Sequence, residues 1–366
     1  MPVTASRLQL FVARVLEKVG VPDADARLLA ETLVEADLRG VHSHGVMRLP
    51  NYVQRIRAGL VRPEAHCTIT AEGPAFAQID AHNSLGQVAS ARAMDVAIAK
   101  ARHSGVGLVG VAHSTHFGAA AYYVMQAASK RMIGIAITNT LPLMPAVGGA
   151  AKIVGNNPIA YAIPAGRHQP IVLDIATSVV ANGKIQRARA LGERIPLGWG
   201  VDGKGMPTDR AEAVMDGGML LPVGGHKGFG LAMIFDLLCG PLTGAAWSAG
   251  VAGLALPEHS RPQDIGHLFV AIDVARFRSM DEFLHEVDAY IDAVHGAPRA
   301  PGVERLYVPG EIEFEMADAR RRECIPLDPP ARAGLAALAR ELALDPLDHP
   351  EGSTAIKDIA GGKANP

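Results

Sequence analysis

Short apolar runs that alternate with helix-like segments constrain the fold of this chain more than any other feature. Between residues 106 and 176 four runs are rich in Val and Ile: VGLVGVA, MIGIAITNT, PIAYAIP and PIVLDIA. Helical patterns occupy residues 86–103 and 118–130. Strands that alternate with helices predict an α/β region, which we place at residues 76–300.

Both ends of the chain carry helical patterns instead. Residues 4–40 predict two helices split by GVPDA, and residues 281–294, 313–324 and 329–344 predict further helices. We therefore expect an N-terminal helical part over residues 1–75 and C-terminal helices over residues 301–349. The polar tail, residues 350–366, is expected to be disordered.

Charge and cysteine content exclude several classes of function. The 366 residues carry 35 Lys and Arg against 37 Asp and Glu without a basic stripe, so neither nucleic acid nor a membrane surface is expected as a partner. The chain lacks a signal-peptide pattern and any run of the ~18 apolar residues that span a bilayer, so we expect a cytoplasmic protein. Cys67, Cys239 and Cys324 form no C-x-x-C pair, which argues against a disulfide framework or a structural zinc site.

Polar residues follow three of the predicted strands. The first strand runs into HSTHFG, which places His113 and His116 in a loop before a helix. The second ends at Asn139 and Thr140, and the last ends at Asp174. In open α/β sheets the ligand crevice lies beyond the carboxyl ends of the strands. We therefore expect one pocket lined by all three ends.

Three glycine-rich stretches resemble phosphate-binding loops to different degrees. GVGLVG (105–110) follows a helix and lies inside a strand, and GWGVDGKG (198–205) lacks the Ser or Thr of a P-loop and the helix after it, so we reject both. PVGGHKGFG (222–230) precedes a long apolar helix. Gly224 and Gly225 free the backbone to turn N–H groups toward an anion, and Lys227 adds positive charge. This stretch predicts a phosphate- or carboxylate-binding loop, with close helix packing as the alternative.

The stretch RGVHSHGVMRLP (39–50) is compatible with a metal site or an acid/base site. His42 and His44, together with His113 and His116, could supply the nitrogen ligands of a zinc or iron site in a metal-dependent hydrolase. No carboxylate follows either histidine pair at a ligand spacing, so we expect no metal.

The acid/base interpretation explains more of the same stretch. A helix that begins near Ser43 would place His44 and Arg48 on one face, with Pro50 in its first turns. Imidazole exchanges protons near neutral pH, and a guanidinium can clamp a carboxylate. Together with the anion-binding loop, these groups indicate redox chemistry at a 2-oxo or 2-hydroxy acid.

The motifs, in their order and spacing, resemble a known family. RGVHSHGVMRLPNYVQRI, AHSTHFGAAAYY, GNNPIAYAIP, VLDIATS, GWGVDGKGMPTD, LLPVGGHKGFGLAMIFDLLCGPLTGA and VPGE are similar to the malate/L-lactate dehydrogenase family whose fold is not the Rossmann fold, over residues 5–330. That family includes L-malate, L-lactate, L-sulfolactate and ureidoglycolate dehydrogenases, diketogulonate reductase and reductases of piperideine- and pyrroline-2-carboxylate. The resemblance implies a homodimer, NAD or NADP in a non-Rossmann α/β domain, and a helical domain built from both chain ends, in which residues 301–349 pack on the N-terminal part.

The resemblance also implies roles for individual residues. The acid/base histidine matches His44 in some members and His116 in others, and Ser43 and Arg48 match substrate-contacting positions. Many relatives carry Asp at the position of His42, so proton chemistry or substrate choice would differ here if this side chain tunes His44. The positions that match the surroundings of the cofactor are Thr140, Asp174, Ile175, Ala176, Gly224, Gly225, Pro309, Gly310 and Glu311, with Lys227 near its phosphate.

The sequence therefore predicts a cytoplasmic NAD- or NADP-dependent oxidoreductase that moves hydride between nicotinamide and C2 of a small 2-hydroxy or 2-oxo acid. A reductase of a cyclic imino acid or a ureidoglycolate dehydrogenase is the alternative within the family. A metal-dependent hydrolase is the alternative outside it.

Overall fold

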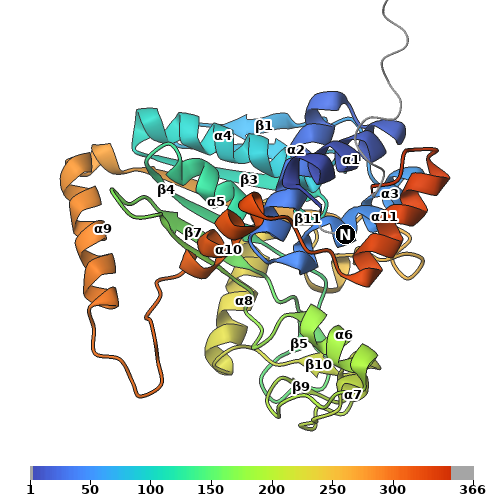
Figure 1. Cartoon of the computed structure of the whole chain (residues 1–366). Helices are drawn as coiled ribbons and strands as arrows, with labels where there is room; N and C mark the ends of the chain where they lie inside the picture. The colour runs from blue at the N-terminus through green and yellow to red at the C-terminus, as the bar shows by residue number, and fades with distance from the viewer. Residues whose placement is uncertain (1–2, 348–366) are drawn as a thin grey trace, which may run out of the picture.

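A seven-stranded sheet forms the centre of the molecule, for which a computed structural model describes residues 3–347 (Figure 1). The tail predicted at 350–366 lies outside the described residues. Only β2 and β3 pair in parallel in this sheet, and all its other neighbours are antiparallel. In spatial order the strands are β1 (Thr68–Glu72), β2 (Phe76–Asp80), β3 (Val106–Ser114), β11 (Ile265–Asp273), β4 (Met132–Thr138), β7 (Ile159–Ile163) and β8 (Ile171–Ile175).

The antiparallel pairing brings three strand ends to one edge. Strand β11 separates β3 from β4, and β7 separates β4 from β8, each in the opposite direction. Strands β3, β4 and β8 therefore run the same way, as expected, although the sheet is not the parallel sheet on which that expectation rested. This topology also confirms that the α/β fold is not a Rossmann fold.

Helices cover both faces of the sheet because its strands alternate their apolar side chains. Ala136 and Phe269 belong to the core beneath α4 (Gly86–Ser104) and α5 (Ala121–Ala128), whereas Ile137 and Leu268 pack toward α8 (His226–Cys239) on the other face. Gly107 explains the GVGLVG stretch, since a Cβ there would lie 1.9 Å from the carbonyl oxygen of residue 97 in α4. The glycine is needed for close helix packing.

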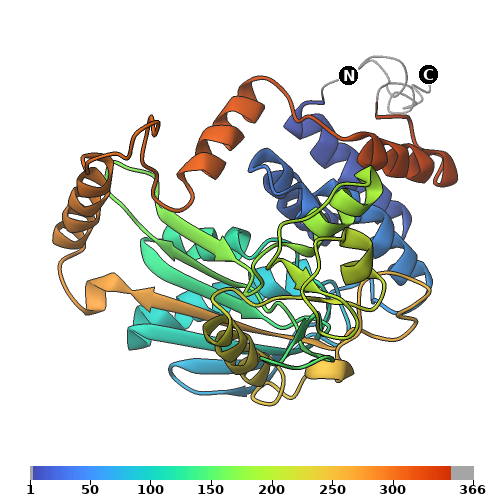
Figure 2. The ribbon, with the colours of Figure 1, turned by 90° about the horizontal axis from the view of Figure 1, so that it is seen from below.

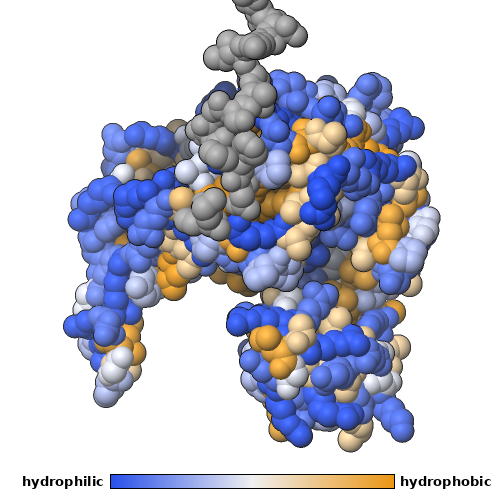
Figure 3. All heavy atoms as spheres, turned by 45° about the vertical axis from the view of Figure 1, so that its right-hand side comes forward, coloured by the Kyte–Doolittle hydropathy of each residue, from blue (hydrophilic) through white to orange (hydrophobic). Residues whose placement is uncertain are grey.

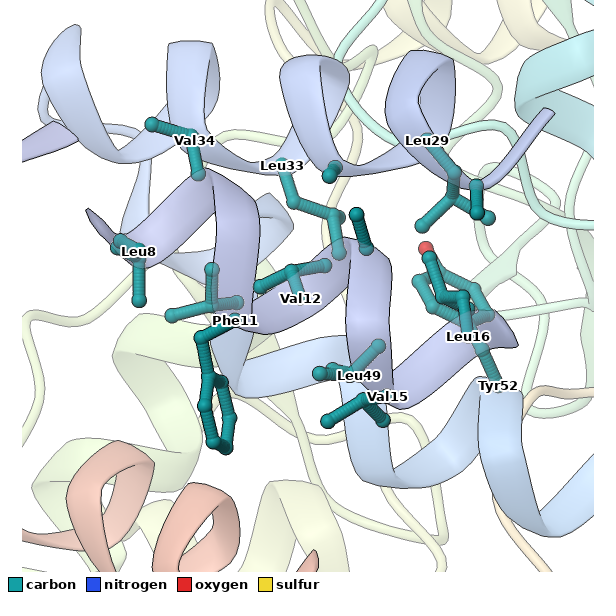
Figure 4. Close-up of a cluster of buried hydrophobic side chains, with 14 of the residues drawn as sticks. Leu8, Phe11, Val12, Val15, Leu16, Leu29, Leu33, Val34, Leu49 and Tyr52 are labelled. Carbon is teal, nitrogen blue, oxygen red and sulfur yellow. The ribbon is translucent and has the colours of Figure 1, made fainter. Parts of the chain in front are cut away.

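A helical layer unites the two ends of the chain. Helices α1 (Ala5–Lys18), α2 (Asp23–Leu38) and α3 (Leu49–Arg57) share one apolar core with residues of α10 (Glu311–Arg322) and α11 (Pro329–Glu341). Leu8, Val12 and Leu16 recur at helical spacing and point into this core (Figure 4). Figure 2 shows α11 beside the N-terminal helices. This packing confirms a helical part built from both chain ends.

A lobe built from residues 141–154 and 177–222 projects from the body of the molecule (Figures 1 and 3) and has its own small core. The rejected motif GWGVDGKG contributes β9 and a turn here, and no long helix follows it. The lobe consists of β5 (Met144–Pro145), β6 (Lys152–Val154), α6 (Asn182–Leu191), β9 (Gly200–Val201), α7 (Ala211–Met215) and β10 (Met219–Leu220).

Helix α9 (Met280–His295) lies against the other end of the sheet. Its Asp288 carboxylate accepts hydrogen bonds from the backbone N–H groups of Gly166 and Arg167.

Candidate active site

The RGVHSHGVMRLP stretch folds into two short 3-10 turns, His42–His44 and Val46–Arg48, before α3 begins at Leu49. The helix expected to begin near Ser43 is therefore wrong. The chain instead breaks at Gly45, whose extended backbone (φ −86°, ψ −156°) separates the two turns. The buried carboxylate of Asp37 at the end of α2 holds this conformation, since it accepts the Val46 N–H at 2.8 Å and lies 2.8 Å from Nδ1 of His42. Pro50 does lie in the first turn of α3, as predicted.

His42 is engaged with Asp37 and does not line the central cavity. An aspartate at position 42 would instead face the carboxylate of Asp37. His42 therefore helps to hold the turn through Asp37, and whether it also tunes His44 stays a prediction.

One cavity of about 840 Å³ lies beyond the carboxyl ends of β3, β4 and β8, a volume typical of ligand sites. The expected common pocket is therefore present. Its wall combines the 3-10 turns, the strand ends, the first turn of α6, the loop at 252–265 and the segment that leads into α10. From these elements the wall includes Ser43, His44, Arg48, His116, Asn139, Thr140, Asp174, Ile175, Ala176, Asn182, Leu254, Pro309 and Gly310.

The four predicted catalytic residues meet in this cavity. Nε of Arg48 donates to the carbonyl oxygen of Ser43 at 2.7 Å, and neither Nη atom has a hydrogen-bond partner among the described residues. Ser43 Oγ lies 2.9 Å from Nδ1 of His44, and the rings of His44 and His116 stack with centroids 5.6 Å apart. A guanidinium free to bind a carboxylate thus lies beside two imidazoles.

Both imidazoles are neutral at pH 7 in this setting. Burial, and secondarily the positive charge of Arg48, lower the pKa of His44 from 6.5 to about 4. Burial lowers the pKa of His116 well below its ordinary value, with further contributions from the charges of His44, Arg48 and His267. Neutral rings can accept a proton or donate a hydrogen bond, depending on the nitrogen that carries the hydrogen.

Two buried side chains that the sequence analysis missed support the wall. The guanidinium of Arg55 is fully buried and donates to the carbonyl oxygens of His259 at 2.9 Å and Arg261 at 2.6 Å. Gln263 accepts the backbone N–H of His116 through its Oε1 at 3.1 Å. These hydrogen bonds connect the 252–263 loop to α3 and to His116. The sequence could not predict them, because the partners of Arg55 lie about 200 positions away along the chain.

Most of the residues expected around the cofactor line the same cavity. Thr140, Asp174, Ile175 and Ala176 belong to its wall, and so do Pro309 and Gly310, which lie beside β8 because the Pro309 carbonyl oxygen accepts the Val172 N–H at 2.9 Å. The Asp174 carboxylate accepts the Ala121 N–H at 2.8 Å, and burial raises its pKa to about 6 against the lowering effects of that N–H and of the Arg39 charge.

Four residues of the same prediction lie elsewhere. Gly224, Gly225 and Lys227 are exposed at the start of α8 and are not part of the cavity wall. Glu311 pairs with Nε2 of His295 and accepts the Val308 N–H at 2.8 Å, so its carboxylate is engaged within the protein.

The volume of the cavity and the Arg39 side chain in its wall fit a ligand with anionic groups, such as a nicotinamide dinucleotide. The Arg39 side chain is about 95% buried in the wall beside Asp174, with its guanidinium 4.5 Å from the ring centroid of Phe314, and its Nη1 has no hydrogen-bond partner. A buried guanidinium nitrogen without a partner is costly unless a ligand satisfies it. Arg39 was not predicted from the sequence.

The histidine pairs do not converge as a metal site would require. His113 is the penultimate residue of β3, not part of the following loop as expected, and its Nδ1 lies 3.1 Å from Asp80. Among residues 3–347 no group of three or more His, Cys, Asp or Glu side chains could hold a metal ion. Within the same range no helix is long and apolar enough to cross a membrane.

A cavity with an arginine beside paired neutral histidines is suited to an enzyme that acts on a small carboxylic acid. The family model described as malate/L-lactate dehydrogenase matches residues 3–336, and the chain belongs to that family. It is 39% identical over 345 residues to a malate dehydrogenase of Pyrococcus abyssi, covering 92% of this chain and 94% of that protein.

Two further relatives agree with this assignment. An L-sulfolactate dehydrogenase of Methanothermobacter thermautotrophicus is 39% identical over 335 residues, covering 92% of this chain and 95% of that protein. The solved structure of malate dehydrogenase from Pyrococcus horikoshii superposes with a TM-score of 0.87 at 37% identity, covering 94% of this chain and 97% of that one. The predicted family, fold class and enzyme class are confirmed.

Proposed function

We propose that this enzyme transfers hydride between NAD or NADP and C2 of a small 2-hydroxy or 2-oxo acid of the malate or lactate type. The observation that carries the proposal is the free end of the Arg48 guanidinium beside the neutral rings of His44 and His116 in one cavity. An arginine can hold a carboxylate through two parallel hydrogen bonds, which fixes the adjacent C2 atom. The named activities of the relatives, malate and sulfolactate dehydrogenation, support a small acid as the substrate.

His44 is the proposed acid/base residue. It lies closest in sequence to Arg48, and its low pKa keeps the ring neutral and able to take the hydroxyl proton during oxidation. For Nε2 to present its lone pair, Ser43 Oγ must accept the proton on Nδ1, a contact that the 2.9 Å separation allows. When bound, the nicotinamide accepts or supplies the hydride.

The cofactor is proposed to bind along the strand-end side of the cavity. Thr140, Asp174, Ile175 and Ala176 would hold it there, and the unpaired Nη1 of Arg39 would meet one of its anionic groups. Gly224, Gly225, Lys227 and Glu311 are proposed cofactor contacts on the basis of the family resemblance alone.

A substrate and cofactor panel tests this function. The purified protein is mixed with malate, lactate, ureidoglycolate or sulfolactate and NAD or NADP, or with piperideine-2-carboxylate and the reduced cofactors, while absorbance at the reduced-nicotinamide band is followed. We expect turnover with at least one 2-hydroxy acid. Turnover of piperideine-2-carboxylate alone would replace the proposal by imino-acid reduction, and no absorbance change with any pair would overturn it.

We also propose that the protein is a cytoplasmic homodimer. Helix α8 and the segment after it expose a row of large apolar side chains that a second copy would cover: Leu231, Met233, Ile234, Leu237, Leu242 and Trp247. Contiguous exposed apolar surface is typical of protein interfaces. Sedimentation equilibrium of the protein and of its Leu237→Glu variant tests the dimer, and a monomeric wild type would refute it.

A further inference from the structure

Tyr52 is buried behind the cavity and reaches His116 from α3. Its hydroxyl lies 2.8 Å from Nδ1 of His116, and the two ring centroids are 6.0 Å apart. The Tyr52 side chain does not line the cavity and is only 3% exposed, so it can influence a bound substrate only through His116. Its ring belongs to the same apolar core as Leu16 and Leu29, which Figure 4 also labels, and this packing fixes the position of the hydroxyl.

The same ring nitrogen receives a second hydrogen bond. The backbone N–H of Gly118 points at Nδ1 of His116 from 3.3 Å. A backbone N–H can only donate, so Nδ1 must present its lone pair. The Tyr52 hydroxyl then donates to Nδ1 as well, and the single hydrogen of the neutral ring is carried by Nε2.

Burial keeps His116 in this neutral form. It is the main cause that lowers the pKa of His116, and a positive charge on His44, Arg48 or His267 lowers that pKa further. Burial also raises the pKa of Tyr52 above its ordinary value, so the phenol keeps the proton that it donates. The Nε2 atom has no hydrogen-bond partner among residues 3–347, and His116 is part of the cavity wall.

We infer that Tyr52 is a positioning residue that, with the Gly118 N–H, holds His116 as the Nε2–H tautomer, so that His116 donates a hydrogen bond to the C2 oxygen and does not accept its proton. This inference rests on the proposed function. In oxidation the substrate O–H bond breaks and its proton passes to Nε2 of His44, while the C2–H bond breaks with its electron pair leaving as hydride to the nicotinamide. His116 keeps its proton throughout and polarises the forming carbonyl, as a preorganised donor does. If His116 were the base, Tyr52 would have to accept a hydrogen from Nδ1 and the Gly118 contact would be lost.

Nitrogen NMR of the resting protein tests the tautomer directly. With ¹⁵N-labelled histidine, and His116→Gln to assign the signals, we expect Nδ1 of His116 to show the unprotonated type of shift and Nε2 the protonated type. Tyr52→Phe removes the shorter, 2.8 Å hydrogen bond to Nδ1 and leaves only the 3.3 Å Gly118 contact, so it should populate the other tautomer in part. Tyr122→Phe is the matched control, because it also loses one side-chain hydrogen bond, to Glu31 at 3.0 Å, but does not contact His116. A lone pair on Nε2 in the wild type would overturn the inference, and so would an unchanged spectrum in Tyr52→Phe.

Kinetics add an independent discrimination once a substrate is known. Loss of one preorganised donor in His116→Ala should lower kcat by about 10²- to 10³-fold. Glutamine can donate but cannot accept a proton, so His116→Gln should recover at least about tenfold of that loss and keep the acidic limb of the pH–rate profile. A glutamine variant as slow as alanine, with the limb abolished, would make His116 the base. The NMR test needs no turnover, so an unproductive substrate panel would leave it intact.

Discussion

In the pH profile of kcat/KM for oxidation, the fall in rate on the acidic side should lie far below the ordinary pKa of histidine. In the free enzyme the proposed base, His44, has its pKa lowered from 6.5 to about 4, mainly by burial and secondarily by Arg48. The limb of kcat/KM reports groups of the free enzyme, so it should fall near pH 4. The sequence alone would have placed it near the ordinary value for imidazole.

The difference is large enough to measure at a single pH. At about pH 5.5 a base with a pKa of about 4 is roughly 97% neutral, whereas one with a pKa of about 6.5 is roughly 9% neutral. We therefore expect kcat/KM at that pH to stay close to its plateau, instead of falling about tenfold. Arg48→Gln should raise the pKa of His44 only partly toward 6.5, because burial is the larger cause of the shift.

The assay is kcat/KM for oxidation of the best 2-hydroxy acid from about pH 4 to 8 with saturating cofactor, with circular dichroism at each pH to show that the protein stays folded. Titration of the His44 ring signal by NMR gives the same pKa without turnover. A limb near pH 6.5 that His44→Ala abolishes would refute the argument that burial sets the pKa. A limb near pH 4 that persists in His44→Ala would refute His44 as the base.

Three further predictions follow from the same contacts. Arg48→Lys should lower kcat/KM by about 10- to 1000-fold, or about 1.4 to 4 kcal/mol, because an ammonium cannot form two parallel hydrogen bonds to a carboxylate. Cofactor affinity, measured by fluorescence titration, should stay nearly unchanged, and unchanged kinetics would show that Arg48 does not bind the substrate. Arg55→Leu should lower the free energy of unfolding in urea by about 3 kcal/mol and raise KM, because the carbonyls of the 252–263 loop lose their donor. Arg57→Leu, which removes only a surface ion pair with Glu341, should cost less than about 1 kcal/mol, and equal losses would contradict the anchoring role of Arg55. Activity should survive a chelator, and full inhibition reversed by a divalent ion would show that a metal takes part.

Local patterns were sufficient to predict four of the seven sheet strands, β3, β4, β7 and β8, and where the polar residues meet. The segments that follow β3, β4 and β8 carry His116, Thr140 and Asp174 into one cavity. Strands β1, β2 and β11 were not predicted, and neither was the antiparallel pairing of β7 and β11, because a period of two along a strand contains no information on its pairing partner.

Long-range partners account for what the sequence could not predict. Tyr52 and His116 are separated by 64 positions, and Arg55 binds carbonyls about 200 positions away. The local spacing of His44 and Arg48 suggested one continuous helix, but the extended backbone at Gly45 divides the stretch into two turns, which the Asp37 carboxylate holds through the backbone N–H of Val46. The pKa values of the histidines also depend on burial, which follows only from the assembled cavity.

Gly45 shows how tightly the turns fit around this carboxylate. A Cβ at position 45 would lie 2.2 Å from Oδ1 of Asp37, and a backbone atom pressed against a buried carboxylate has little room to move. Gly45→Ala should therefore displace the side chain that holds both turns and disturb His44.

The expected cost of Gly45→Ala is about 1–3 kcal/mol of unfolding free energy in urea, the usual range for overpacking, together with a lower kcat/KM. Gly203→Ala is the matched control, because its added Cβ would meet nothing closer than 3.4 Å, and its effect should stay within about 0.5 kcal/mol. The double variant Gly45→Ala with Asp37→Ala isolates the clash, since the same alanine should cost less once the carboxylate is gone. Additive losses in that cycle would show that Gly45 is needed for a reason other than Asp37, and the account of why this stretch does not form a helix would then fail.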